Sequence, residues 1–235
     1  MSGQAPRAVL FDLDDTLVHR ARSIAAWAAR FARDFADRLP DADVDEIAEL
    51  SLAQDNGGYL GAGSPHESIR AAVGATLASR LHWAGRVDAR EIEDHWRAQL
   101  PAHSVEMPGA SAAVDALAQR GLRLAIVSNG AERSRAATLA NLAFRDRIGT
   151  LVSSERAGAR KPEAAVFTLA ASELGVAPHD CWVVGDHPIN DVAGGEAAGM
   201  KAVWLTGFHR WDRTAPPLRA IDSLAQLAAL VDAAR

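Results

Sequence analysis

The sequence predicts an α/β fold in which helices cover both faces of a parallel sheet, with an all-helical segment inserted after the first strand. Short apolar runs alternate with longer helical patterns over residues 110–234, as in sheets built from strand–helix–strand units. Residues 18–100 break this rhythm, because helical patterns run through the whole segment. We therefore expect two domains, a core formed by residues 1–17 and 101–235 and a helical domain formed by residues 18–100.

The elements of the core are expected in chain order from residue 8. Residues 8–11 form a short apolar strand. Further strands are expected at residues 122–128, 148–153, 181–185 and 202–205, and helices at residues 110–120, 132–142, 162–174, 191–198 and 221–234. Gly121 fits the end of the first of these helices, and Pro162 fits the first turn of the third, where a missing N–H costs nothing.

The inserted segment is expected to form helices at residues 22–38, 44–54, 65–81 and 88–100. Trp27, Phe31 and Phe35 recur at a spacing of four residues, as on a helix that buries one face. This aromatic stripe indicates core packing. The run Asp55-Asn-Gly-Gly-Tyr59 interrupts the helical pattern and is expected to form a loop.

Composition narrows the functional classes. The chain has 235 residues, 49% of them hydrophobic, and a formal net charge of −5, which offers no support for nucleic-acid binding. No apolar run reaches the ~20 residues that span a bilayer, and the N-terminus lacks a secretory apolar segment. Cys181 is the single cysteine, so no disulfide framework forms within the chain. We expect a cytoplasmic protein that binds neither nucleic acid nor membrane, as a monomer or a homodimer.

Four polar segments follow predicted strands or open a predicted helix. They are Asp12-Leu-Asp-Asp-Thr16, Ser128-Asn-Gly130, Arg160-Lys-Pro162 and Gly185-Asp-His-Pro-Ile-Asn-Asp191. Ligands of open parallel sheets bind at the edge formed by the carboxyl ends of the strands, so we expect these segments to meet there. Lys161 stands out as well, because it and Lys201 are the only lysines among 25 basic residues.

The first polar segment concentrates carboxylates. Asp12 and Asp14 point to the same side of an extended chain, and Asp15 adjoins them. Carboxylates this close repel one another, and the end of an apolar strand is a costly place for them. A bound cation is the simplest compensation, so the segment indicates a metal-dependent reaction centre.

The four segments, in this order and at about this spacing, resemble the DxDxT, S/T, K and GDxxxD motifs of the haloacid dehalogenase (HAD) superfamily. The resemblance runs the length of the chain. It implies a Rossmann-like parallel-sheet core with an inserted all-helical cap, as in the helical-cap (C1) subclass, subfamily I, and its phosphatase branch. Caps of this kind close over small soluble substrates and exclude water.

The resemblance implies a catalytic pair and a phosphate site. Asp12 is expected to be the nucleophile that attacks phosphorus. Asp14 is expected to protonate the leaving alkoxide and then to deprotonate the attacking water. The Ser128 hydroxyl, the backbone N–H of Asn129 and the Lys161 ammonium are expected to offset the charge of the phosphoryl group.

The resemblance also implies a Mg2+ site, which suits oxygen ligands. The expected ligands are Asp12, the backbone carbonyl of Asp14 and Asp186. Asp191 is expected to lie behind these ligands or to reach the ion through water, and to orient Lys161.

The predicted function is a Mg2+-dependent phosphatase that hydrolyses a small soluble phosphate monoester through a phosphoaspartate intermediate. Asp14 favours this reaction over 2-haloacid dehalogenation, because a departing alkoxide needs a proton and a halide does not. Phosphomutases stay open, although they typically carry Val or Ile where Thr16 stands. The alternative from another class is a catalytically inactive HAD-like module that binds a partner.

The sequence does not select one substrate. Nucleotides, sugar phosphates and phosphoglycolate all fit a phosphatase of this subclass. Candidate specificity positions in the helical domain are Asp55, Asn56, Tyr59, His66 and Arg70.

Two motif residues keep open roles. Asp15 stands where the family often has Gly, and it either caps the following segment or touches the substrate. His187 adjoins Asp186, but a Mg2+ site prefers oxygen ligands, so we expect it to be a hydrogen-bonding residue at the edge of the pocket.

Overall fold

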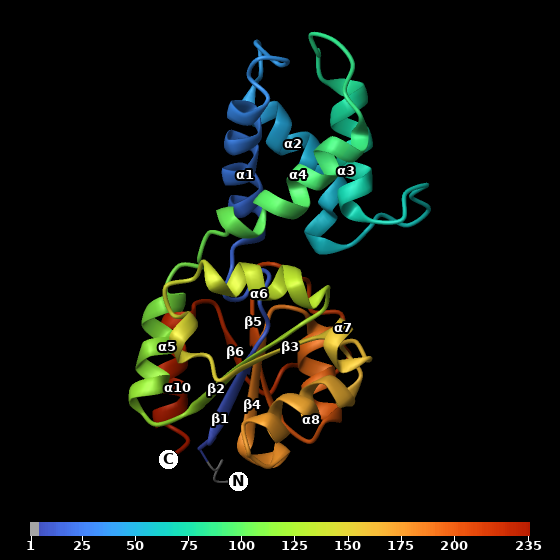
Figure 1. Ribbon diagram of the computed structural model, residues 1–235. Helices are drawn as coiled ribbons and strands as arrows, with labels where there is room; N and C mark the ends of the chain where they lie inside the picture. Colours follow the sequence, from blue (N-terminus) through green and yellow to red (C-terminus); the bar gives the residue numbers. More distant parts are fainter. Residues whose placement is uncertain (1–4) are drawn as a thin grey trace. The chain divides into compact units, whose positions relative to one another are not determined.

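The computed structural model describes residues 5–235, and within them the chain folds as two compact units. One unit runs up to Val18 and resumes at Glu106, and the other is His19–Val105 (Figure 1). Each unit has a hydrophobic core of its own. No helix in residues 5–235 is long and apolar enough to cross a membrane.

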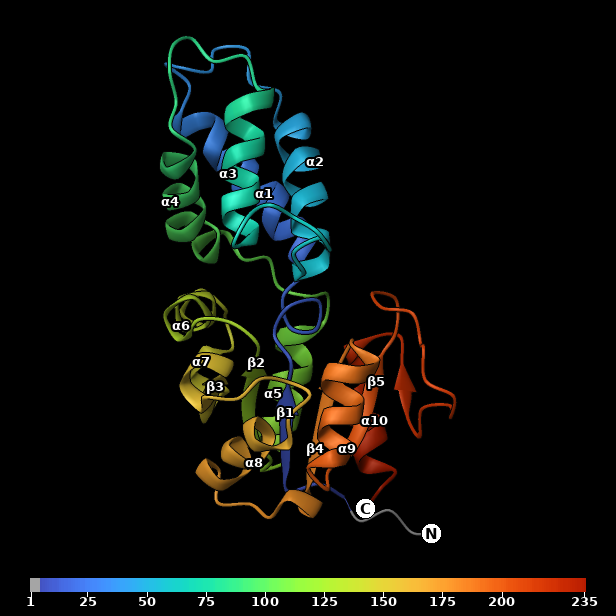
Figure 2. The same ribbon diagram turned by 90° about the vertical axis from the view of Figure 1, so that its right-hand side faces the viewer.

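The first unit is built on a parallel sheet that has six strands within residues 5–235, in the order β3-β2-β1-β4-β5-β6 (Figure 2). The central strand, β1, is fully buried. The strands are β1 (Ala8–Phe11), β2 (Arg123–Ser128), β3 (Thr150–Ser153), β4 (Cys181–Gly185), β5 (Lys201–Leu205) and β6 (Ala220–Ile221).

Helices cover both faces of this sheet, and β1 shows why. Its side chains alternate between the faces, so Val9 and Phe11 join one core cluster while Ala8 and Leu10 join the other. A strand buried on both faces is apolar at every position, as residues 8–11 are. The α/β fold predicted from the sequence is confirmed. The clusters are closed by α5 (Ala110–Gln119) and α10 (Leu227–Asp232) on one face and by α8 (Ala164–Glu173) on the other (Figure 1).

The structure differs from the expected elements where local packing overrides the pattern. The helix expected at residues 191–198 is a π-helical turn, η5 (Pro188–Ala193), followed by α9 (Gly194–Ala197). Gly194 and Gly195 let this segment pack closely, since an added Cβ would lie 2.7 Å from Phe167 and 2.8 Å from Val183 respectively. The sequence reading also missed β6, which is too short to show periodicity, and the four-residue α7 (Ser154–Ala157). The remaining helix of this unit is α6 (Glu132–Ala140).

The second unit is helical. Trp27 and Phe31 are fully buried in its core, as the aromatic stripe predicts. The third helix begins four residues later than expected, because the Ser68 side chain accepts a hydrogen bond from the backbone N–H of Ala71 and caps the helix there. The helices are α1 (Arg20–Asp34), α2 (Val44–Asp55), α3 (Ile69–Arg80) and α4 (Ala89–Gln99).

Candidate active site

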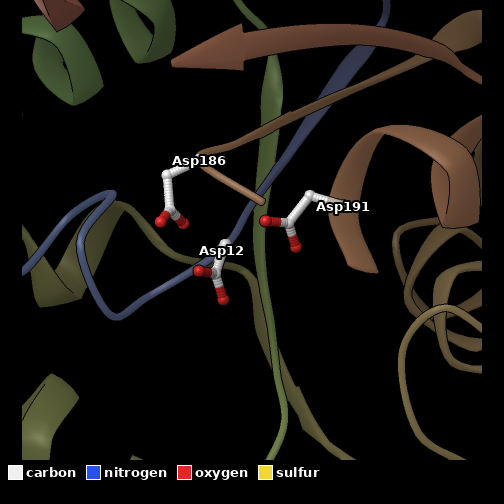
Figure 3. A group of neighbouring side chains, drawn as sticks. All are labelled: Asp12, Asp186 and Asp191. Carbon is white, nitrogen blue, oxygen red and sulfur yellow. The ribbon is translucent and has the colours of Figure 1, made fainter. Parts of the chain in front are cut away.

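Three aspartates meet where β1 and β4 end. The two strands pair in parallel with Phe11 opposite Val184, so Asp12 and Asp186 leave the sheet at the same edge. The turn η5 brings Asp191 back to this edge (Figure 3). Each of the three contributes a carboxylate oxygen to a group whose members lie within 4.8 Å of one another. All three residues are buried, so their charges are poorly screened by water.

Lys161 supplies a positive charge to this cluster. Its Nζ donates to Asp12 Oδ1 at 2.5 Å and to Asp191 Oδ1 at 2.7 Å. Burial lowers the pKa of Lys161, but the carboxylates of Asp12 and Asp191 outweigh burial and hold the pKa above its usual value. The lysine therefore stays charged at neutral pH.

Asp12 is nevertheless surrounded by an excess of negative charge. Burial raises the pKa of Asp12 well above its usual value, and Asp191 and Asp186 raise it further, while Lys161 opposes them. Three buried carboxylates thus lie together, and the one buried ammonium among them binds Asp12 and Asp191. Such a cluster is stabilised by a further cation, and its oxygen donors are the type that Mg2+ prefers.

Gly185 makes the position of Asp191 possible. A Cβ added at Gly185 would lie 2.3 Å from Asp191 Cγ, well inside van der Waals contact. Asp191 Oδ2 accepts a hydrogen bond from the backbone N–H of His187 at 2.9 Å, while its Oδ1 binds Lys161. The glycine of the Gly-Asp pair is therefore required for space, a role that the sequence reading did not assign.

Asp186 is held from two sides. Thr16 Oγ1 donates to its Oδ1 at 3.3 Å, and His209 Nδ1 lies 2.7 Å from its Oδ2. The indole Nε1 of Trp204 donates to the Asp186 backbone carbonyl at 2.8 Å. Thr16 thus supports the site from the loop after β1, whereas His209 and Trp204 lie outside the sequence motifs.

Two of the predicted phosphate-binding residues, Ser128 and Asn129, lie at the end of β2, and Lys161 lies in the segment before α8. Ser128 is the buried last residue of β2, the strand beside β1. Asn129 follows it, and its side chain bonds the Lys161 backbone in both directions: Oδ1 accepts from N at 2.9 Å and Nδ2 donates to O at 3.2 Å. The sequence reading used only the backbone N–H of Asn129. These two hydrogen bonds connect the segment 128–130 to the segment 160–162.

Asp14 is paired with Arg135, a residue that the sequence reading missed. Arg135 Nη1 donates to Asp14 Oδ2 at 2.8 Å, and its Nε and Nη2 donate to the Asn129 carbonyl at 3.0 and 2.7 Å. Gly130 leaves room for this guanidinium, because an added Cβ would lie 2.6 Å from Arg135 Nε. Arg135 therefore connects the first motif to the second. One arginine among many in the sequence carries no signal of this contact.

A family model for haloacid dehalogenase-like hydrolases matches residues 6–199. The chain belongs to this family. The match includes β1, β4, η5 and all four motifs, so it covers the whole acidic cluster.

Curated relatives extend the family assignment over nearly the full chain. A phosphoglycolate phosphatase from Rhodospirillum rubrum is 32% identical over 226 residues, covering 94% of this chain and 86% of the relative. A ribulose-1,5-bisphosphate 5-phosphatase from Halopiger xanaduensis is 28% identical over 95% of this chain and 98% of its own length.

Solved structures share the fold. The HAD-hydrolase YfnB from Bacillus subtilis superposes with a TM-score of 0.72 at 20% identity, covering 97% of this chain and all of that one (100%). An L-2-haloacid dehalogenase from Xanthobacter autotrophicus gives a TM-score of 0.67, also at 20% identity, over 97% of this chain and 98% of its own. A dehalogenase shares this fold while the curated relatives are named as phosphatases, so the fold alone does not select the reaction of this HAD-like hydrolase.

The two open motif residues have local partners in the HAD-like core. Asp15 is buried and has a left-handed backbone with φ 55°, a conformation that glycine adopts at lower cost. Its backbone N–H donates to the Val18 carbonyl at 2.6 Å and closes the turn after β1. His187 Nδ1 accepts from the backbone N–H groups of Ile189 and Asn190 at 3.1 and 3.3 Å, so it caps η5.

Two candidate specificity residues of the helical unit form ion pairs within that unit. Asp55 is almost fully buried and binds Arg20 through two hydrogen bonds, of 2.7 Å from Nε and 2.6 Å from Nη2. Arg70 Nε donates to Glu93 Oε1 at 2.7 Å on the surface. Asp55 and Arg70 are therefore each engaged in an ion pair within the helical unit.

Proposed function

We propose that this HAD-like hydrolase is a Mg2+-dependent phosphatase that hydrolyses a small soluble phosphate monoester through a phosphoaspartate intermediate. The observation that carries the proposal is the buried cluster of Asp12, Asp186 and Asp191 around Lys161, with a second carboxylate, Asp14, two residues beyond Asp12. The phosphatase names of the curated relatives support the same reaction class.

Asp12 acts as the nucleophile in the first step. Lys161 orients its carboxylate through Oδ1, and burial removes the water that would compete for it. The carboxylate attacks phosphorus and forms an aspartyl phosphate while the bond from phosphorus to the alkoxide oxygen breaks. Asp14 gives its proton to that oxygen, so the alcohol leaves neutral.

Asp14 acts as the base in the second step. It takes a proton from water, whose oxygen attacks phosphorus, and the bond between phosphorus and Asp12 breaks. Inorganic phosphate and the Asp12 carboxylate are regenerated, and the proton on Asp14 restores the starting state. Arg135 holds the Asp14 carboxyl group in place through Oδ2.

Three groups offset the charge that moves through the phosphoryl group. Lys161 contributes a permanent positive charge, and the Ser128 hydroxyl and the Asn129 backbone N–H contribute hydrogen bonds. The Asn129 side chain keeps Lys161 in place through the two bonds to its backbone. Ser128 and Asn129 lie at the end of β2, and Lys161 lies in the segment between α7 and α8.

The carboxylates of Asp12 and Asp186, with the backbone carbonyl of Asp14, would hold Mg2+. When bound, the ion supplies positive charge that stabilises the phosphoryl oxygens. Asp191 already accepts from Lys161 with one oxygen and from the His187 N–H with the other, which supports an indirect role behind the ligands.

The helical unit, His19–Val105, serves as the cap of this cytoplasmic enzyme in our proposal. It is inserted between the first strand and α5, where the helical-cap subclass carries its cap. A cap excludes water from the aspartyl phosphate and selects among small substrates such as nucleotides, sugar phosphates and phosphoglycolate.

The test is hydrolysis of p-nitrophenyl phosphate with Mg2+, with Mg2+ and excess EDTA, and with Mg2+ restored. Turnover that EDTA abolishes and Mg2+ restores supports the proposal, and a panel of phosphoglycolate, sugar phosphates and nucleotides then ranks substrates by kcat/KM. Chloride release from a 2-haloacid without phosphatase activity would identify a dehalogenase. A folded, metal-replete protein that turns over no phosphate ester would favour the inactive module.

A further inference from the structure

The loop between β5 and β6, residues 206–219 (Figure 2), lies outside all four motifs, and its His209 side chain still contacts the acidic cluster. It carries His209, whose Nδ1 lies 2.7 Å from Asp186 Oδ2. A carboxylate only accepts hydrogen bonds, so Nδ1 carries the hydrogen and donates it. This bond is shorter than the 3.3 Å bond from Thr16 to the other oxygen of Asp186.

The loop is anchored in a way that fixes His209. The Trp211 ring packs on the Trp204 ring with centroids 4.9 Å apart, and Trp204 in turn donates to the Asp186 backbone carbonyl. The Arg213 guanidinium lies 5.3 Å from the Trp211 ring centroid and binds Glu196 of α9 at 2.6 Å. The His209 ring also packs against His187, with centroids 4.5 Å apart.

We propose that His209 is a positioning residue that orients the Asp186 carboxylate for the divalent cation, so that the loop 206–219 forms a fifth segment of the active site. The inference rests on the proposed metal site. Asp186 is nearly fully buried, and a carboxylate held at both oxygens keeps one orientation when the cation binds. Groups that hydrogen-bond metal ligands in this way typically contribute about 10–100-fold to metal affinity.

The test measures binding of Mn2+ alone to the full-length protein after EDTA treatment and dialysis, with free Mn2+ counted by electron paramagnetic resonance. His209→Phe keeps a ring against His187 but removes the donor, and we expect its Mn2+ affinity to fall about 10–100-fold. His209→Asn places an amide N–H where Nδ1 lies and is expected to bind within about threefold of wild type. His209→Gln places its amide one atom farther out and is expected to bind as weakly as His209→Phe.

His179→Phe is the matched control. His179 is an exposed histidine before β4, at the opposite edge of the sheet from Asp186, and its replacement is expected to leave Mn2+ affinity unchanged. The Asn variant decides the case even if His209→Phe is poorly folded, because a structural role for the ring would not distinguish Asn from Gln. Equal Mn2+ affinity of wild type, Asn and Gln variants overturns the role of His209 and leaves the phosphatase intact. A wild-type protein that binds no Mn2+ overturns the metal site itself.

Discussion

The two units bury charge in opposite ways. In the helical unit, the buried Asp55 carboxylate is paired with one cation, Arg20, which binds both of its oxygens. In the α/β unit, the buried carboxylates of Asp12 and Asp191 share the Lys161 ammonium, and the buried Asp186 carboxylate binds Thr16 and His209. Arg20 thus matches the Asp55 charge, whereas the three carboxylates of the α/β unit have one lysine and one histidine beside them.

This difference in charge balance distinguishes a structural ion pair from a candidate ligand-binding site. In a balanced buried ion pair the two charges match without any ligand. Removing one partner therefore lowers the stability of the fold. A buried cluster with excess negative charge is stabilised by a bound cation, which is why we propose it as the site for a cation and a phosphate ester. The predictions below test whether each arrangement behaves as its charge balance implies.

Asp12→Asn is expected to have the largest effect, and on activity alone. The amide keeps the shape of the side chain but cannot attack phosphorus, so kcat should fall by more than about 10³-fold, as for other covalent nucleophiles. Thermal unfolding should not become easier, because one of three crowded carboxylates is removed. Steady-state kinetics and a melting curve check both statements. Asp146→Asn, at a side chain that is 84% exposed, is the control.

Arg20→Met is expected to have the largest effect on stability. It leaves Asp55 buried and unpaired in the helical unit, which should lower the free energy of unfolding by about 3 kcal/mol. Urea denaturation measures the loss. Adding Asp55→Leu should recover most of it, because the unpaired charge is then gone. A single variant as stable as wild type would contradict the structural role of the pair.

Gly185→Ala is expected to lower activity by about 100-fold, since the added methyl group displaces Asp191 and with it Lys161. That loss corresponds to about 2.7 kcal/mol in the activation barrier. The measurement is kcat at saturating substrate. Gly61→Ala is the matched control, because a Cβ there meets no atom within 4 Å. Equal kcat for both variants would show that Asp191 needs no precise placement.

Arg70→Ala is expected to have the smallest effect. Arg70 pairs with Glu93 on the surface, where ion pairs are screened by water, so the free energy of unfolding should change by less than about 0.5 kcal/mol. Denaturation curves of the two proteins measure this. A fall in kcat/KM with unchanged stability would instead return Arg70 to the role of a specificity residue.

Local sequence patterns predicted the sheet and the motif residues. They did not predict contacts between residues that are far apart in the sequence. Strands such as residues 181–185 follow from apolar runs, and Asp12 and Asp186 follow from carboxylates placed at strand ends. Arg135 and His209 could not be predicted, because nothing in their neighbourhoods records which distant carboxylate they contact.

In the helical unit, a residue that the sequence suggests for substrate binding has a structural partner instead. Asp55 stood in a polar loop and suggested a substrate contact, but its charge is matched by Arg20, 35 residues away in sequence. The residue type shows which interactions a side chain can make. It does not show whether a distant residue in the fold already makes them.

In the proposed mechanism, Asp12 carries the phosphoryl group between the two steps. The direct measurement is to quench the enzyme during turnover with Mg2+ and substrate, reduce it with borohydride, which converts an aspartyl phosphate to homoserine, and sequence the peptides by mass spectrometry. We expect homoserine at position 12, dependent on substrate and absent from Asp12→Asn. Homoserine at another aspartate, or normal turnover by Asp12→Asn, would contradict it.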